Sequence, residues 1–412
     1  MAKITQLYQT PPHGDSGMDE YKKKLFRHRA GLGARFIICA AVLLAVILGF
    51  FIWSRNRTYT GYEVVSSVEH STTLNTQYAE YNGQLLRYSR DGITCVNSRN
   101  EAVWSQTYNM QSPILDICGS TAAVADQQGN EVYVFDSQGL LTQITTLLPI
   151  QQISVSSQGV TAVLLNDSSV SWIYLYDSEG NMLAESRCSL DETGQPLSIS
   201  LSSDGTKLAV SYLQIQDGVA ASCIVFYNFS SVGANFVDKI VSSQIYTETL
   251  IPRVKYLGSS VCAAVSDQGL IFYEGAEIPE ETVTVNVEED ILSVFFGTDK
   301  VGIITEGSSG TEGETADTDG ASEAAGRYQI SIYDTNGKLT LTERTDLKYT
   351  QAKFSQNMLI LYNDTECEIY SAQGVLKYAG TFDTAISDIC KGAGWGRYIV
   401  VFSDRTDTIR LK

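Results

Sequence analysis

The sequence predicts an all-β protein, an eight-bladed (alternatively seven-bladed) β-propeller preceded by one N-terminal transmembrane helix. Three observations predict it: an uncharged apolar run near the N-terminus, a composition of strands and tight turns, and a repeating unit of about 44 residues. Among 412 residues there are 23 Tyr and 33 Gly but only 7 Pro. The 359 residues beyond the apolar run exceed what one ordinary core needs, so a repeat-built domain or two domains are required.

Residues 36–53 form the apolar run, with 18 uncharged and almost wholly apolar residues. At about 1.5 Å per residue they cover roughly 27 Å, close to the bilayer's hydrocarbon core of about 30 Å. The run ends in aromatic residues, and no small-residue cleavage site follows it. We therefore expect an uncleaved signal-anchor helix that contacts the lipid bilayer through 36–53, followed by a juxtamembrane linker at 54–60.

The flanks of this helix predict its orientation. Residues 1–35 form a basic and largely disordered tail, whereas the far flank offers only Arg55 and Arg57. The positive-inside bias places the tail in the cytoplasm and residues 61–412 outside it, so the expected location is the cell membrane, single-pass. The cations that determine this topology are Lys22, Lys23, Lys24, Arg27, Arg29 and Arg35.

The charge of the large part limits its partners. The whole chain has a net charge of −18, with 29 Lys/Arg and 47 Asp/Glu. Residues 1–35 hold seven of the bases and three of the acids, which leaves 22 basic and 44 acidic residues from 54 onward. So acidic a surface repels phosphate backbones, and nucleic acid is not an expected partner.

The repeat is clearest in a hairpin that ends in aromatic-Asp-Ser-x-Gly or a close variant. It occurs at 132–139, 173–180, 330–337 and 368–374. In it Gly supplies the positive φ of the turn, and Asp or Ser bonds the turn backbone. Residues 76–104 and 350–378 also align without a gap. Units begin near 76, 113, 151, 197, 251, 290, 350 and 385.

The last unit predicts how the ring closes. It supplies strands at 385–390, 397–402 and 407–412 and then lacks a fourth. Residues 61–70 alternate like a strand, and we expect them to fill that place as a closing strand. Such a closure hides edges that an open sheet would expose.

Two motifs carry a resemblance to known families. Ile93–Trp104 resembles the repeat of quinoprotein (PQQ-like) eight-bladed propellers, and Leu201–Ala209 resembles the Ser-Pro-Asp-Gly turn of WD40-like and TolB-type repeats, with Ser203 in place of Pro. The whole layout is similar to uncharacterised Gram-positive single-pass membrane proteins that share a domain of unknown function. That resemblance implies a role in the cell envelope and no particular activity. The adjacent cysteines that quinoprotein dehydrogenases use to bind their cofactor do not occur.

We identify no catalytic, cofactor-binding or metal-binding residue in the sequence, and expect no cofactor. His70 is the one histidine beyond the apolar run, and Asp317–Gly320 begins like a calcium loop but lacks its later ligands. Trp104, Trp172 and Trp395 are expected to pack in the core, and the cysteines to be buried and free. A pair of carboxylates that cleaves a glycan or peptide is neither indicated nor excluded.

Two insertions indicate a partner face. Residues 307–326 form an acidic, disordered insertion between the second and third strands of one unit, and 214–222 lengthen the same joint of another. The candidate contact residues are Gln214, Gln216, Asp217, Glu312, Glu314, Asp317 and Asp319. The leading hypothesis is a non-catalytic binding or scaffold module for an envelope protein, peptide or polymer. The alternatives are a sensor that signals to the cytoplasmic tail, or a propeller enzyme that uses paired carboxylates. The oligomeric state stays open.

Overall fold

The computed structural model describes residues 41–45, 49, 56–69, 76–167, 170–189, 193–216, 218–307 and 326–412. The chain divides into two compact units, Met1–Arg57 and Thr58–Lys412. In the first unit, residues 41–45 and 49 are helical. No helix within the described ranges is long and apolar enough to cross a membrane. The basic tail 1–35 and most of the predicted anchor lie outside these ranges, so the anchor stays a prediction.

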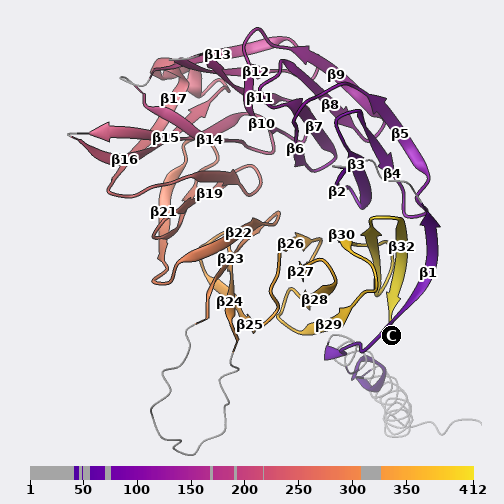
Figure 1. Cartoon of the computed structure of the whole chain (residues 1–412). Helices are drawn as coiled ribbons and strands as arrows, with labels where there is room; N and C mark the ends of the chain where they lie inside the picture. The colour runs from indigo at the N-terminus through magenta and orange to yellow at the C-terminus, as the bar shows by residue number, and fades with distance from the viewer. Residues whose placement is uncertain are drawn as a thin grey trace, which may run out of the picture. The chain divides into compact units, whose positions relative to one another are not determined.

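The second unit consists of eight four-stranded antiparallel sheets, called here blades 1 to 8 (Figure 1). Blade 1 contains β2 (Gln77–Tyr81), β3 (Gln84–Tyr88), β4 (Gly92–Val96) and β5 (Ala102–Thr107). Blade 2 contains β6 (Pro113–Cys118), β7 (Thr121–Asp126), β8 (Glu131–Asp136) and β9 (Gly139–Thr145). Blade 3 contains β10 (Ile150–Val155), β11 (Thr161–Asp167), β12 (Val170–Tyr176) and β13 (Met182–Ser189). Blade 4 contains β14 (Gln195–Leu201), β15 (Lys207–Gln216), β16 (Val219–Asn228) and β17 (Ile240–Thr247), with η1 (Gly233–Asn235) and η2 (Val237–Lys239) before β17.

Four further blades complete the unit. Blade 5 contains β18 (Arg253–Tyr256), β19 (Val261–Ser266), β20 (Gly269–Glu274) and β21 (Glu280–Asn286). Blade 6 contains β22 (Ile291–Phe296), β23 (Lys300–Glu306), β24 (Tyr328–Asp334) and β25 (Leu339–Thr345). Blade 7 contains β26 (Gln351–Ser355), β27 (Met358–Tyr362), β28 (Glu366–Ser371) and β29 (Leu376–Thr381). Blade 8 contains β30 (Ile386–Lys391), β31 (Arg397–Phe402), β32 (Arg405–Leu411) and, from the start of the unit, β1 (Tyr62–Glu69).

The prediction of an eight-bladed propeller is confirmed, and the seven-bladed alternative is wrong. Blade 8 has the strand order β1-β32-β31-β30, so β1 is its outermost strand. β1 pairs antiparallel with β32 from Tyr62 opposite Leu411 to Glu69 opposite Arg405. The first and last strands of the unit therefore lie side by side and join the ring.

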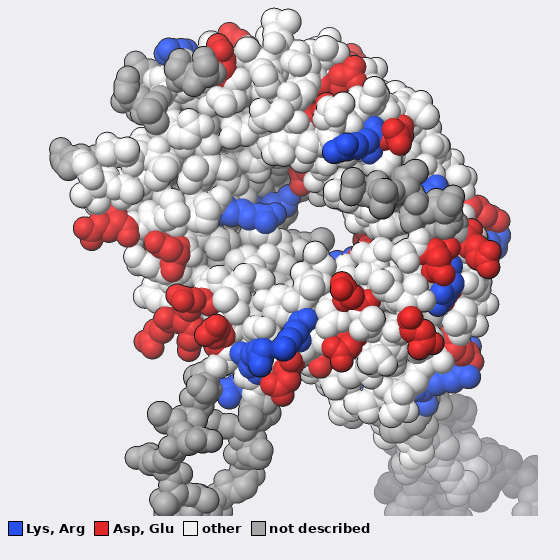
Figure 2. All heavy atoms as spheres, viewed as in Figure 1, with Lys and Arg blue, Asp and Glu red and all other residues white. Residues whose placement is uncertain are grey.

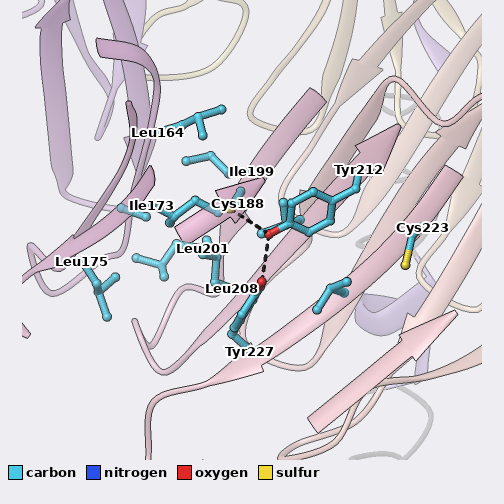
Figure 3. Packing of buried hydrophobic residues seen from close by; sticks show 13 residues of the cluster. Leu164, Ile173, Leu175, Cys188, Ile199, Leu201, Leu208, Tyr212, Cys223 and Tyr227 are labelled. Atoms are coloured by element: carbon cyan, nitrogen blue, oxygen red, sulfur yellow. Dashed lines mark hydrogen bonds between the residues drawn. The ribbon is translucent and has the colours of Figure 1, made fainter. Parts of the chain in front are cut away.

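Eight clusters of buried apolar side chains in the described chain hold the blades together, and each joins two consecutive blades. The smallest joins blade 8 to blade 1 through residues such as Leu85 and Val401. Figure 3 shows the cluster between blades 3 and 4, where the hydroxyl groups of Tyr212 and Tyr227 lie 2.8 Å apart. Burial of these aromatic rings and aliphatic chains supplies the main favourable term of folding.

The second strand of each blade explains the apolar runs in the sequence. In β7, β11 and β19 five or more consecutive residues are buried. A strand in the middle of a blade is covered on both of its faces by the neighbouring blades. Its side chains must therefore be small or apolar on both faces, rather than on alternate positions only.

The connections between strands define two faces of the ring. The closure face holds the turns between first and second and between third and fourth strands, together with the hydrogen bonds of Thr60 and Gly61 to Lys412. The hairpin face holds the other connections, including the β15–β16 turn. On the closure face, first turns of successive blades are hydrogen-bonded, as from Thr121 Oγ1 to Ser157 O (3.0 Å) and from Ser157 N to Ser203 O (3.0 Å).

The recurring Asp-x-x-Gly hairpin lies at the turn between third and fourth strands, as its spacing predicts. Asp334 Oδ1 accepts hydrogen bonds from the backbone N–H groups of Asn336 and Lys338, both at 2.9 Å. Gly337 follows with φ +69°. A Cβ atom on Gly337 would lie 2.7 Å from Val283 Cγ1, on the fourth strand of the preceding blade. The motif thus combines a left-handed turn with close packing between blades.

We expect Gly337→Ala to destabilise the propeller more than Gly83→Ala. Both glycines have positive φ, at +69° and +73°, but the position beside Gly83 is open. Each substitution should lose about 1 kcal/mol for the left-handed backbone. Gly337→Ala should lose about 1 to 3 kcal/mol more through overpacking against Val283. Unfolding curves of the two variants measure the difference, and equal losses would contradict the packing role.

Cysteines in the described residues are free, and all but the half-buried Cys118 are buried. Burial disfavours the thiolate form and raises the pKa of Cys95 to about 11 and that of Cys367 to about 12. These thiols pack as small apolar groups, as the sequence predicts.

The folded chain should therefore react poorly with an aromatic disulfide reagent at pH 8. At that pH a thiol whose pKa rises by two units holds about 100-fold less thiolate, and burial also blocks access. Unfolding in denaturant should release the full set of thiols to the reagent. Rapid reaction of Cys95 or Cys367 in the folded chain, located by peptide mapping, would show that their burial is wrong.

Candidate functional site

The hairpin face carries a projecting arm made by β15 and β16. These strands have ten residues each, and their ladder continues to the pair Gln216–Val219. The arm displays Ile215, which is 75% exposed, and Val219, which is 40% exposed. The sequence predicts an insertion at 214–222, and in the structure it consists of two lengthened strands and their turn. Extra backbone pairs make this arm stiffer than a loop of the same length.

Of the candidate contact residues, Gln214 and Gln216 lie in the part of β15 nearest the β15–β16 turn. Gln214 Nε2 donates a hydrogen bond of 2.8 Å to the carbonyl of Thr193, which braces the arm against the segment before β14. Asp217, Glu312, Glu314, Asp317 and Asp319 lie outside the described residues, as do the six topology-determining cations. The structure thus brings Gln214 and Gln216 together on the arm and gives no geometry for the acidic candidates.

A cavity of about 640 Å³ lies where the first strands of blades 2, 3, 4 and 5 converge. It is lined by apolar side chains such as Ile114, Leu164 and Pro252, and by as many polar ones. The polar lining residues are Asp116, Gln127, Gln151, Gln152, Ser154, Ser198, Arg253 and Lys255. Arg253 begins β18, Pro252 precedes it, and Gln127 follows the last residue of β7, all at strand ends on the hairpin face, so the cavity lies toward that face. Figure 2 shows basic side chains beside the central opening in this view.

Side chains on the first strands link four blades around this cavity. Asp116 Oδ1 forms an ion pair with the Lys255 ammonium at 2.8 Å. Asp116 Oδ2 accepts hydrogen bonds from Val155 N at 2.8 Å and from Ser154 Oγ at 3.2 Å. Ser154 Oγ accepts in turn from Leu201 N at 3.0 Å. Asp116 and Lys255 belong to blades 2 and 5, so their ion pair crosses two intervening blades.

The same pattern repeats between adjacent first strands. Gln152 Oε1 accepts from Ile199 N at 3.1 Å, and Ser200 Oγ accepts from Tyr256 N at 2.9 Å. Ser198 Oγ accepts from Val254 N at 3.2 Å. In each case a side-chain oxygen of one blade accepts from a backbone N–H group of the next blade. These N–H groups lie on the first strand and have no partner strand on that side. We call this set of contacts the polar brace.

Two groups at the cavity retain capacity for a ligand. The guanidinium of the exposed Arg253 lies 5.1 Å from the centre of the Phe296 ring, a cation–π contact, and its planar N–H groups are strong hydrogen-bond donors. Gln151 Oε1 is buried and has no hydrogen-bond partner in the described chain. A strong planar donor and an unpaired acceptor at one cavity suit a polar ligand that carries both functions.

A second charged network lies on the first strands of blades 7, 8 and 1. Lys353 pairs with Asp388, whose Oδ1 also accepts from the Tyr362 hydroxyl at 2.9 Å. Burial and the Asp388 charge raise the pKa of Tyr362 well above its usual range, so the phenol stays a donor. Ser355 bonds Glu80 and accepts from the backbone N–H of Lys391 at 2.6 Å. Asp116 and Asp388 occupy equivalent places in their repeats, and each is neutralised by a lysine of another blade.

The carboxylates of the cavity and of the second charged network are each in contact with another side chain. Asp116 is the single carboxylate among the residues that line the cavity, and an ammonium group holds it. Glycoside cleavage requires a second carboxylate at a defined separation, which this lining does not supply. Glu80 and Asp388 are both engaged in hydrogen bonds on neighbouring first strands.

The expectation that all three tryptophans pack in the core is wrong for Trp395. Trp104 stacks on Phe135 with ring centres 4.9 Å apart, and Trp172 packs against a buried cluster. Trp395 is 70% exposed in the connection between β30 and β31. Trp395 lies outside the strands that pack between neighbouring blades, whereas Trp104 and Trp172 lie within β5 and β12. His70 lies outside the described residues.

Sequence reasoning missed the polar brace, although its signal is present. Asp116 and Asp388 each interrupt an apolar strand, within Ile-Leu-Asp-Ile-Cys and Ile-Ser-Asp-Ile-Cys. A charge at a position where neighbours are buried needs a partner. The sequence cannot show which lysine supplies it, because Asp116 and Lys255 are 139 residues apart.

A double-mutant cycle of Asp116→Asn and Lys255→Met should show a coupling of about 1 to 2 kcal/mol in unfolding free energy, since both groups are partly shielded from water. The matched control is the exposed pair Glu63–Lys412, which has the same 2.8 Å distance. Its coupling should be smaller and should vanish in 1 M salt. Equal couplings with equal salt dependence would mean that Asp116 and Lys255 do not brace the ring.

Comparisons with known proteins agree with this architecture. No curated protein matches the chain. Among solved structures, the C-terminal WD40 domain of Sif2 aligns with a TM-score of 0.54 at 11% identity, covering 86% of this chain and 100% of that chain. BamB from Moraxella catarrhalis aligns with a TM-score of 0.49 at 12% identity, covering 85% and 100%. Such identities concern the fold alone. The matching family model spans residues 55–411, and the chain therefore belongs to a family of unknown function, DUF5711.

Proposed function

We propose that this chain is a membrane-tethered, extracytoplasmic β-propeller that binds an envelope protein, peptide or polymer without catalysing a reaction on it. The tether is the predicted helix 36–53, and the binding surface is the hairpin face. No cofactor takes part. The observation that carries the proposal is that one face of a closed ring holds both the cavity and the β15–β16 arm.

The rigidity of the ring supports a scaffold role. Apolar clusters join each blade to the next, and the polar brace fixes the first strands of blades 2 to 5. A surface held in one conformation loses little conformational entropy when a partner docks. Binding energy is then not spent on ordering the site.

The chemistry of the hairpin face supports a protein or peptide partner. Exposed aliphatic side chains such as Ile215 are removed from water when a partner covers them, and interface centres are rich in such contacts. The cavity beside them combines apolar side chains with polar and charged ones, so it can contact both the apolar and the hydrogen-bonding groups of a peptide. Arg253 at its mouth is of the residue type enriched where interfaces bind most tightly.

In-cell photo-crosslinking tests this proposal. A photoreactive amino acid replaces Ile215 on the hairpin face, and the matched control replaces Val237, which is 84% exposed on the closure face. We expect a discrete adduct from position 215 that position 237 does not give. Mass spectrometry then identifies the partner, and Arg253→Ala should reduce the adduct several-fold if the cavity shares the interface.

Two outcomes would contradict the proposal. Equal adducts from both positions would mean that neither face is selective. Turnover of a glycan or peptide by the purified chain, abolished by Glu80→Gln or Asp388→Asn with the fold intact, would replace the binding role with an enzymatic one.

A further inference from the structure

Trp395 is displayed by a constrained loop on the closure face. Gly394 and Gly396 on either side have positive φ, at +97° and +66°. The Lys391 ammonium donates hydrogen bonds to the carbonyl oxygens of Gly394 at 2.9 Å and Arg397 at 3.0 Å. These bonds hold the loop backbone in place. The Trp395 indole is 70% exposed on this ordered loop. A surface that covered it would remove a large apolar ring from water.

The same loop adjoins the point where the chain enters the propeller. The carbonyl of Gly396 accepts from Leu411 N at 2.9 Å, and the carbonyl of Lys412 accepts from Thr60 N at 3.2 Å. Tyr59 N donates to Lys377 O at 2.8 Å. A short chain of backbone hydrogen bonds thus connects the Trp395 loop with Tyr59 and Thr60, the first residues fixed to the ring.

The length of the preceding segment limits the distance to a membrane. Residues 54–58 separate the predicted anchor from Tyr59, and five residues span at most about 18 Å. The headgroup region is roughly 5 to 8 Å thick on each side of the hydrocarbon core. The closure face of blade 8 therefore lies within reach of the headgroups if residues 36–53 span the bilayer.

The charge around Trp395 fits such a surface. Arg397, Arg410 and Lys412 are exposed on the same end of blade 8, in a chain whose net charge is −18. Glu63 is the acid that pairs with Arg410 and Lys412 there. Basic groups beside an exposed indole are the combination found at the interface of anionic membranes, where indole rings settle among the headgroups.

Exposed apolar side chains elsewhere on the closure face extend this pattern to the other blades. Each lies in a connection on that face or within three residues after one. They are Val103, Leu140, Leu141, Met182, Leu183, Phe236, Val237, Ile278, Leu339 and Leu376. With Trp395, every blade contributes at least one.

We infer that the closure face docks on the lipid surface, with Trp395 inserted among the headgroups and Arg397 and Lys412 facing lipid phosphates. The inference rests on the proposed membrane tether and adds an orientation. The propeller lies on its closure face, and the hairpin face points away from the bilayer, toward partners.

Fluorescence quenching by brominated lipid tests this orientation. The full chain is reconstituted into vesicles of phosphatidylcholine and phosphatidylglycerol with bromine near the headgroup end of the acyl chains. Trp395→Phe supplies the baseline from Trp53, Trp104 and Trp172. Trp395→Phe combined with Ile215→Trp is the matched control, because it moves one indole to a site of similar exposure, 75%, on the hairpin face.

We expect the fluorescence contributed by Trp395 to fall by at least half in brominated vesicles and to resist aqueous iodide. The indole at position 215 should behave in the opposite way. If the chain floats with the vesicles but Trp395 is quenched by iodide and not by bromine, the docking inference is wrong and the tether stands. A chain that does not float overturns the tether and the docking together.

Discussion

The burial of each second strand between two neighbouring blades is the constraint on which this structure depends. A sheet with apolar side chains on both faces is stable only when both faces are covered, so every blade needs a neighbour on each side. A row of such blades would leave two apolar faces exposed at its ends. The ring removes those ends, and the pairing of β1 with β32 completes the eighth blade across the start and finish of the unit.

The sequence was sufficient for the fold because the information is local and repeated. The Asp-x-x-Gly turn recurs in several units, and the apolar runs beside it have the length of strands. The unit starts favour eight blades and leave seven as the alternative, and the eight sheets of the structure decide between them. Residues 61–70 could be assigned to closure because the last unit lacked one strand. That assignment rests on the number of strands per unit and not on a motif.

The candidate site was harder to predict because its contacts are not local. Asp116, Ser154, Leu201 and Lys255 lie on four different blades, and only the curvature of the ring brings them together. Trp395 was misassigned for a related reason. It lies in the connection between β30 and β31, flanked by Gly394 and Gly396 with positive φ, whereas Trp104 and Trp172 lie within strands. A repeat predicts what the blades share, whereas sites arise where one blade departs from the others.

The closing pair β1–β32 also determines how the protein bears mechanical load. The strands of blade 8 run from one face of the ring to the other, and the N-terminal segment continues from the closure-face end of β1. A pull between that segment and a partner on the hairpin face would act along the strand axis. The hydrogen bonds between Tyr62–Leu411 and Glu69–Arg405 would then be loaded in shear, all at once, rather than peeled open one after another. In shear the paired residues of β1 and β32 share the load, whereas strands that unzip break their hydrogen bonds one at a time.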